Sequence, residues 1–229
     1  NYILQYCTEL QSDCFGLSRN KPPIRIGIPP MLSTVFFPEL LTAFQKEYPD
    51  VPVMLEEYAS VRACNLVQND SLDLALVNME QYNIDKFHHA LLANDQVVFC
   101  VSKEHPLVRK EEATIQDMAQ IPLIFFNGDS VQNQLLKIRF ELEGFTPHVL
   151  MHNSQIYTTL QFLKNNNCGC FLYSSMTEKF PDIVQLPLKP PLFIKIGMIW
   201  KKGKYISNDM QTFLNFTRKY YKDHPLIKE

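Results

Sequence analysis

The fold is decided by the stretch Ile24–Val51, IRIGIPPMLSTVFFPELLTAFQKEYPDV, which changes from strand to helix within a few residues. Its first five residues are rich in isoleucine, which favours a β-strand. The apolar residues farther along recur at the spacing of one helix face: Phe37, Leu40, Leu41, Phe44 and Tyr48. The stretch therefore predicts a strand over 24–28, a helix over 34–48, and a turn that places Ser33 and Thr34 at the entrance of the helix.

The same alternation of strand and helix continues to the end of the chain. Residues 72–77, LDLALV, are nearly all apolar, which is typical of a strand buried on both faces of a parallel sheet. Further strands are expected at 51–57, 97–101, 123–126, 149–152, 168–173 and 194–200, and further helices at 60–69, 114–118, 130–143, from 154 and from 207. This order predicts an α/β chain whose two halves form two lobes, joined near residues 98–102 and 190–197.

A separate helix is expected before this alternation begins. The apolar residues of segment 3–14 fall on one face of a helix, and segment 18–23 has the composition of a linker. Such a helix is either the last part of an upstream segment or an element that packs on the domain. The first residue is Asn1 rather than Met, so we expect a fragment or a processed product.

Composition excludes several classes of protein. The 229 residues are 46% hydrophobic and 20% charged, which is the balance of a globular protein. The net charge of −2 gives no overall footprint for nucleic acid. No apolar run approaches the roughly 20 residues of a membrane span, and no signal segment opens the chain.

The sequence contains none of the motifs that carry common chemistry. G-x-G-x-x-G, G-x-x-x-x-G-K-[ST], G-x-S-x-G, H-E-x-x-H and C-x-x-C are all absent. A metal site from His148, His152, Cys168 and Cys170 is conceivable, but no spacing fixes a ligand geometry. We therefore expect no catalytic residues, no metal and no cofactor. Six cysteines are too few for a disulfide scaffold, so reduced thiols are expected.

Small polar residues recur where strands end and helices begin. In open α/β sheets ligands bind beyond the carboxyl ends of the strands, where helix N–H groups and hydroxyls hold polar groups. Each residue alone is explained by helix capping, but together they predict a cleft between the lobes. These residues are Ser33, Thr34, Ser60, Asn78, Ser102, Asn127, Gly128, Ser154 and Ser174.

The order of these stretches resembles the effector-binding domain of the LysR-type transcriptional regulators, over about residues 24–218. Each matching stretch is short, and their order and spacing carry the resemblance. They are the opening stretch at 24–51, LVQNDSLDLALV, VVFCVSKEHPL, IPLIFF, ELEGFTPHVLMHNS and PLFIKIGMIWKKGKYIS.

The resemblance implies a two-lobed periplasmic-binding-protein-like (type II) fold with parallel-rich sheets, two crossover strands and a small-molecule effector between the lobes. Lobe I would comprise residues 24–99 and 197–229, and lobe II residues 100–196. Residues 1–16 would be the end of a linker helix, followed by a linker at 17–23. The resemblance further implies a cytoplasmic homodimer or homotetramer without membrane contact, which binds DNA only through a winged helix-turn-helix absent from this fragment.

The resemblance also implies which residues contact the effector. They come from the turn after the first strand, the second helix, the LDLALV strand, the crossover strand and the other lobe. The matching positions are Met31, Leu32, Ser33, Thr34, Ser60, Val61, Asn78, Val101, Ser102, Asn127, Gly128, Ser154, Tyr173 and Ser174.

Departures from the family pattern leave the effector open. Pro29-Pro30 stands where a serine or threonine is frequent, and Asn78 stands where some members carry an arginine. Both weigh against a carboxylate effector unless Arg62 or Lys103 supplies the charge.

Two other functions remain open as alternatives. The first is an extracytoplasmic solute-binding protein of a transporter. The second is a redox sensor that uses Cys168 and Cys170, although residues two apart on a strand lie roughly 6.5–7 Å apart, which suits a disulfide poorly.

Overall fold

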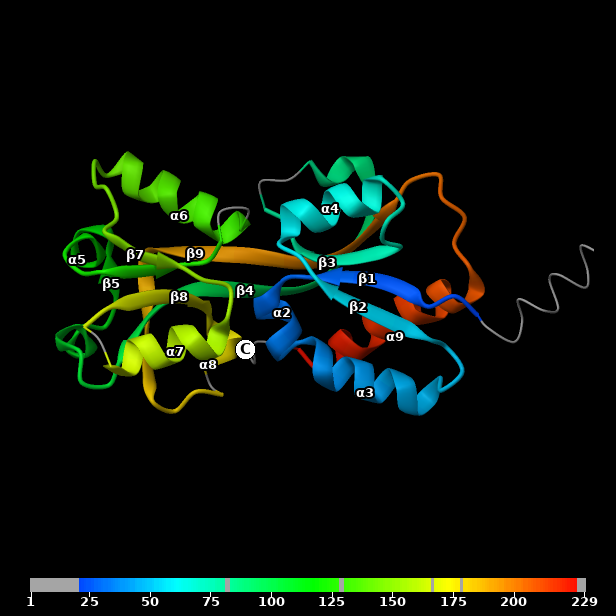
Figure 1. The fold of residues 1–229 in the computed structure, drawn as a ribbon, viewed down its shortest axis with the longest axis horizontal. Helices are drawn as coiled ribbons and strands as arrows, with labels where there is room; N and C mark the ends of the chain where they lie inside the picture. Colours follow the sequence, from blue (N-terminus) through cyan, green and yellow to red (C-terminus); the bar gives the residue numbers. More distant parts are fainter. Residues whose placement is uncertain (1–20, 81–82, 128–129, 166, 178, 226–229) are drawn as a thin grey trace, which may run out of the picture.

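The computed structural model describes residues 21–80, 83–127, 130–165, 167–177 and 179–225. Its main sheet has the strand order β2-β1-β3-β9-β4-β8-β6-β7. Helices lie on both faces of this sheet, and the molecule is elongated along the strands at its centre (Figure 1). The helix expected over 3–14 lies outside the described residues, as do Cys7 and Cys14.

The first half of the sheet contains three parallel strands with β1 in the middle. They are β1 (Ile24–Ile28), β2 (Val53–Glu57) and β3 (Leu74–Asn78). Helix α4 (Ser60–Gln68) covers one face, and α3 (Phe37–Glu47) and α9 (Asn208–Asp223) cover the other (Figure 1). On that second face the rings of Phe44 and Phe213 meet edge to face at 4.9 Å, so the last helix closes the core begun by the first strand.

The single helix expected over 34–48 is in fact two helices. Helix α2 (Pro30–Val35) begins directly after β1, and α3 follows it after Phe36. Proline is placed in the first turn of each helix, where its missing N–H costs nothing. Pro38 cannot donate to residue 34, so a continuous helix is interrupted there.

The second half of the sheet repeats this arrangement. Its parallel strands are β8 (Gly169–Tyr173), β6 (Leu123–Phe125) and β7 (Val149–His152). Its helices are α5 (Ile115–Ala119), α6 (Val131–Leu142), α7 (Ile156–Asn165) and α8 (Ser174–Thr177), with the short strand β5 (Ala113–Thr114) beside β9. The rings of Phe99, Phe125 and Phe171 form the aromatic centre of this half, with centroids 5.4 Å apart for both Phe99–Phe171 and Phe125–Phe171.

Two long strands join the halves. β4 (Phe87–Ser102) and β9 (Ile183–Lys201) pair antiparallel along their length, with irregular pairing at Leu91/Ala93 and at Val97/Val98. They run side by side through both halves of the molecule (Figure 1). The α/β fold with two crossover strands is confirmed, but both strands begin about ten residues before the expected bounds.

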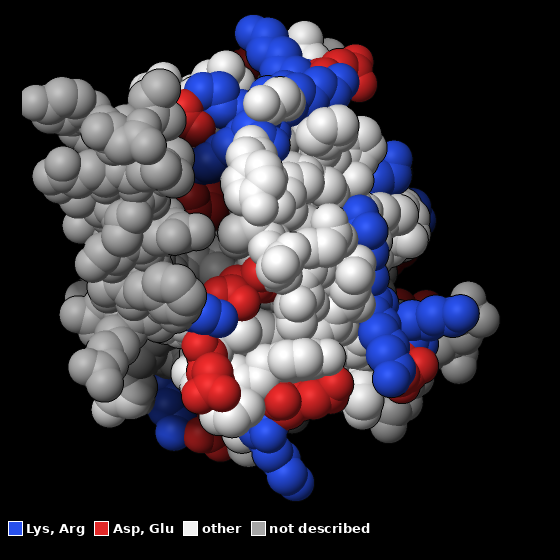
Figure 2. All heavy atoms as spheres, turned by 90° about the vertical axis from the view of Figure 1, so that its right-hand side faces the viewer, with Lys and Arg blue, Asp and Glu red and all other residues white. Residues whose placement is uncertain are grey.

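The lengths of the apolar helices and the distribution of surface charge agree with the expectations from composition. No helix in the described part of the chain is long and apolar enough to cross a membrane. Figure 2 faces the end of the molecule that lies on the right of Figure 1, where basic and acidic side chains both surround a strip of uncharged ones. This face therefore has no surface of a single charge sign.

Candidate functional site

A cavity of about 220 Å³ lies between the two halves of the sheet. It lies beyond the carboxyl ends of β1, β2 and β3 on one side and of β6 and β8 on the other, as expected for a ligand site in an α/β sheet. Both halves of the chain contribute residues to its wall. The lining residues are Pro29, Pro30, Met31, Glu57, Tyr58, Ala59, Ser60, Arg62, Asn78, Phe126, Asn127, Ser130, Val131, Gln132, Ser154 and Tyr173.

Two amides line the cavity from buried positions. Asn78 ends β3 and is 2% exposed, and Gln132 lies in the first turn of α6 and is 1% exposed. Each amide makes one hydrogen bond to the protein, and one atom of each, Asn78 Nδ2 and Gln132 Oε1, has no partner among the described residues. Buried polar atoms are nearly always paired, so these two atoms are candidates to bond a polar group bound in the cavity.

Tyr173 adds a neutral hydroxyl to this buried part of the wall. It ends β8 and is 3% exposed. Burial, together with the nearby Asp95, raises the pKa of Tyr173 well above its ordinary value, so the phenol stays protonated. The Asn78 amide lies close enough to offset part of this rise in pKa, although its nitrogen does not reach hydrogen-bond geometry with any described residue.

The charged residues that line the cavity lie at its exposed rim. Glu57 is the last residue of β2, and its carboxylate contacts the Ser33 hydroxyl. The Arg62 guanidinium lies over the Tyr58 ring, 4.9 Å from the centroid. Among the described lining residues the ionised groups are therefore at the mouth, and the interior is polar but neutral.

Six of the residues expected to contact an effector line this cavity. They are Met31, Ser60, Asn78, Asn127, Ser154 and Tyr173. The structure refines the role of one of them, because the N-cap of α4 is Ala59 rather than Ser60. The Ser60 hydroxyl instead accepts a hydrogen bond from the Asn78 backbone N–H at 3.1 Å. Ser60 thus ties the start of α4 to the end of β3.

The residues expected at the first helix mouth do not line the cavity, apart from Met31. Helix α2 starts at Pro30, so Ser33 and Thr34 lie one turn inside it. Their hydroxyls donate back to the Pro30 carbonyl at 2.9 Å, and Leu32 is fully buried. The expected free N–H groups at Ser33 and Thr34 are therefore not available.

The remaining expected contacts lie elsewhere. Val61 is adjacent to the cavity but does not line it. Val101 and Ser102 lie at the far end of β4, several residues beyond Val97, which pairs with Tyr173. The Ser174 hydroxyl bonds to Gln185 at 3.2 Å. Gly128 lies outside the described residues.

Several lining residues were missed in the sequence. Glu57, Tyr58, Arg62, Ser130 and Gln132 are the polar ones among them. In the run VQNQLL, nothing in the sequence distinguishes the buried Gln132 from the exposed Gln134. Arg62 is the exception, because its positive charge was already considered as a partner for a carboxylate effector.

The cysteines are poorly placed for redox chemistry. Cys168 and Cys170 are buried, and Cys170 pairs in register with Cys100. Burial raises the pKa of Cys168 to about 11, and burial with the neighbouring Cys100 raises the pKa of Cys170 well above its ordinary value. Protonated thiols are weak nucleophiles. No group of three His, Cys, Asp or Glu residues in the described ranges could hold a metal ion.

Two α/β halves, two long joining strands and a cavity between them define a class of ligand-binding domain, the type II periplasmic-binding-protein-like fold. The chain belongs to the LysR family: residues 18–222 match the model of the LysR substrate binding domain. It is an effector-binding domain of this family of transcriptional regulators, which favours neither the transporter nor the redox alternative.

The relatives agree with this assignment. The chain is 28% identical over 207 residues to the uncharacterized HTH-type transcriptional regulator YwbI of Bacillus subtilis, covering 89% of this chain and 68% of that protein. It is 22% identical to the transcriptional dual regulator GltC of the same organism, covering 90% and 69%.

Solved structures show the same fold. The effector-binding domain of QuiR in complex with shikimate has a TM-score of 0.74 at 20% identity, covering 89% of this chain and 98% of that chain. The regulatory domain of Synechocystis CcmR in complex with 2-PG has a TM-score of 0.79 at 18% identity, covering 88% and 98%.

Proposed function

We propose that the cavity between the halves is the effector site and that an effector bound there changes how the halves are arranged. The observation that supports this most is a cavity walled by both halves and bordered by buried polar atoms without partners. A ligand that touches both halves binds their open and closed arrangements unequally. Only that difference in affinity shifts the state of a regulator.

In this proposal the lobes are residues 24–99 with 197–229, and residues 100–196, with β4 and β9 as the hinge. Val97–Phe99 are the exception and belong with the second lobe, because they pair with β8. The effector contacts are the six expected residues that line the cavity, together with Arg62 and Gln132. The ligands in the QuiR and CcmR complexes support a small metabolite as effector. The volume of the cavity also favours a small metabolite, because about 220 Å³ is below the roughly 300–1,000 Å³ of sites for drug-sized ligands.

The output we propose is the one typical of the family. The domain acts in the cytoplasm within a homodimer or homotetramer, and it controls DNA binding by a winged helix-turn-helix domain. Its own contribution is to sense the effector.

Filling the cavity tests the proposal. Ser154 is half-buried in the wall, and within the described part of the chain its hydroxyl accepts one long hydrogen bond, from Asn127 at 3.4 Å. Ser154→Phe should therefore occupy the cavity without removing a strong interaction. A metabolite at about 100 times its Kd should add roughly 2.7 kcal/mol to stability, or about 5–10 °C in Tm. We expect a thermal-shift screen to find such a ligand, and Ser154→Phe to abolish its effect.

The matched control is Ser71→Phe, because Ser71 is exposed at the opposite end of β3. This variant should keep the full shift in Tm. An equal shift in Ser154→Phe would contradict the proposal.

A further inference from the structure

We propose that the effector buries an uncharged hydroxyl or primary amide group against Asn78 and Gln132, and keeps any ionised group at the mouth of the cavity. This inference rests on the proposed effector site and names the chemistry of its ligand. It starts from the two buried atoms without partners, one a hydrogen-bond donor and the other an acceptor.

The donor is the side-chain nitrogen of Asn78. An amide can be turned by 180° without changing its shape, so its orientation follows from its partners. Asn78 Oδ1 accepts a hydrogen bond from the Glu80 backbone N–H at 3.0 Å. That bond needs an oxygen, so the free atom facing away from it is the nitrogen.

The acceptor is the side-chain oxygen of Gln132, by the same reasoning. Gln132 Nε2 donates to the Phe171 carbonyl of β8 at 3.0 Å. A carbonyl oxygen accepts only from a donor, so the nitrogen must lie there and the free atom is the oxygen.

A ligand group that satisfies both atoms must donate one hydrogen bond and accept another. A hydroxyl or a primary amide does both. A carboxylate has no proton to offer Gln132, and an ammonium has no lone pair to offer Asn78. Either ion would also be desolvated against a neutral wall, which is costly without a paired charge.

The charged lining residues allow ionised groups elsewhere on the ligand. Arg62 and Glu57 are both exposed at the rim, where a charge keeps part of its water. The structure therefore assigns two zones to the ligand: a neutral hydrogen-bonding end inside and any charged end outside.

Matched pairs of small metabolites test this chemistry by calorimetric titration of the chain. The probes are nicotinamide against nicotinate, succinamate against succinate, and glycerate against propionate. An unpaired buried polar atom weakens binding about 10- to 100-fold. We expect the amide or hydroxyl member of a binding pair to be tighter by that factor, and a carboxylate or deoxy member that binds equally or more tightly would overturn the proposal.

Two variants locate the preference at the two amides. Asn78→Asp keeps an oxygen for the Glu80 N–H but replaces the free donor with an acceptor, and Gln132→Met removes the free oxygen. Each should weaken the preferred probe about 10- to 100-fold. The control is Gln134→Met, because Gln134 is exposed on the same helix, and its affinity should not change. Melting temperatures of both variants establish that they are folded.

The variants also separate this inference from the proposed function. Binding that is lost in Ser154→Phe but unchanged in both Asn78→Asp and Gln132→Met would overturn the neutral inner zone and leave the cavity as the effector site. Binding that survives Ser154→Phe as well would overturn both proposals.

Discussion

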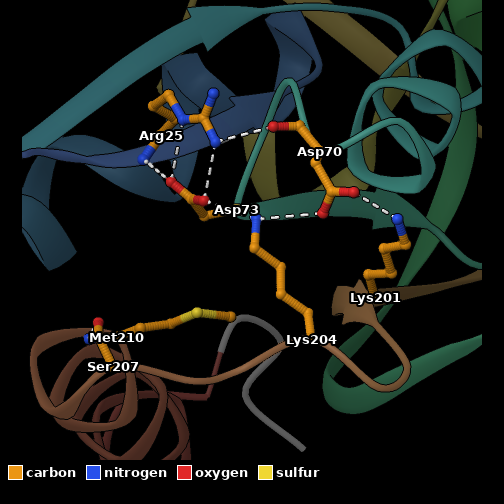
Figure 3. A network of polar contacts seen from close by, with 7 residues as sticks. All are labelled: Arg25, Asp70, Asp73, Lys201, Lys204, Ser207 and Met210. Carbon is orange, nitrogen blue, oxygen red and sulfur yellow. Dashed lines mark hydrogen bonds and ion pairs between the residues drawn. The ribbon is translucent and has the colours of Figure 1, made fainter.

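At the scale of single residues, Asp73 is the clearest electrostatic contributor to stability. Its carboxylate accepts hydrogen bonds from the Arg25 side chain at 3.0 and 3.1 Å and from Lys204 at 2.9 Å (Figure 3). Burial alone would raise the pKa of Asp73, but the bonds from Arg25 and Lys204 outweigh it and lower the pKa to about 2. The network thereby fastens β1 to the start of β3 and to the segment before α9.

We predict that Asp73→Asn lowers the free energy of unfolding by about 2.5 kcal/mol at pH 7, which is the free energy linked to this lowering of the pKa. Because the pKa of the folded state is the lower one, the stabilisation is complete above the ordinary pKa near 4 and is lost as the pH falls through about 2. Urea unfolding at pH 7 and pH 3 should show the difference between the two proteins shrink by about half. The control is Asp50→Asn at an exposed turn, and a difference independent of pH would contradict the prediction.

At the scale of elements, the apolar pattern predicted the buried strands well, whereas the pattern of polar residues predicted only part of the lining of the cavity. The strands over 24–28 and 149–152 have the expected bounds. The long strands were underestimated, because polar residues such as His88, His89 and Asp95 interrupt the apolar run while the backbone stays extended. Strand pairing with β9 overrides the local preference there.

The candidate site was predicted in part for a physical reason. Asn78 lies at a strand end and is placed by the sheet itself, so the strand pattern located it. Tyr173 also lies at a strand end, but it was expected from the family resemblance. The expected role of Ser33 and Thr34 depended on where the helix begins. The helix begins at Pro30, one turn earlier than expected, so the two residues lie inside it. Whether Gln132 faces the cavity depends on how far its helix is rotated about its axis, and the pattern of a single sequence does not determine that rotation.

The packing of β8 against β4 yields a prediction at the same scale. A Cβ at Gly169 would lie 2.1 Å from the Phe99 ring, and Phe99 is fully buried against Phe171. Gly169→Ala should therefore lower the free energy of unfolding by about 1–3 kcal/mol through overpacking. The measurement is urea unfolding at pH 7.

A double-mutant cycle checks the cause. Phe99→Leu makes room beside residue 169, so the added methyl group should cost less in that background than in the parent protein. Equal costs in both backgrounds would show that the strain does not come from this ring.

At the scale of the whole molecule, the halves share two strands rather than a flexible linker. β4 and β9 pair with each other in both halves, although the pairing is irregular at Leu91/Ala93 and at Val97/Val98. Unfolding either half would leave its segments of both strands unpaired. The two halves are therefore expected to unfold together, although each has the size of a small domain.

The single tryptophan makes this expectation measurable. Trp200 lies near the end of β9, next to the residues that pair with β3, so its fluorescence reports on the first half. Circular dichroism reports on both halves. We predict coincident urea transitions by the two methods, and a shift of the Trp200 transition in Gly169→Ala although that residue lies in the other half. Two separated transitions would show independent lobes.

The late arrival of β9 has a consequence for synthesis on the ribosome. β3 is almost wholly buried, yet the residues of β9 that pair with it follow roughly 120 residues later in the chain. At about 5–20 residues per second, this wait lasts about 6–24 s. Throughout that time the edge of the apolar strand β3 stays unpaired, and an unpaired strand edge is a template for aggregation. We therefore expect this edge of β3 to need protection from other chains until β9 has been synthesised, and a product truncated before β9 to be prone to aggregation.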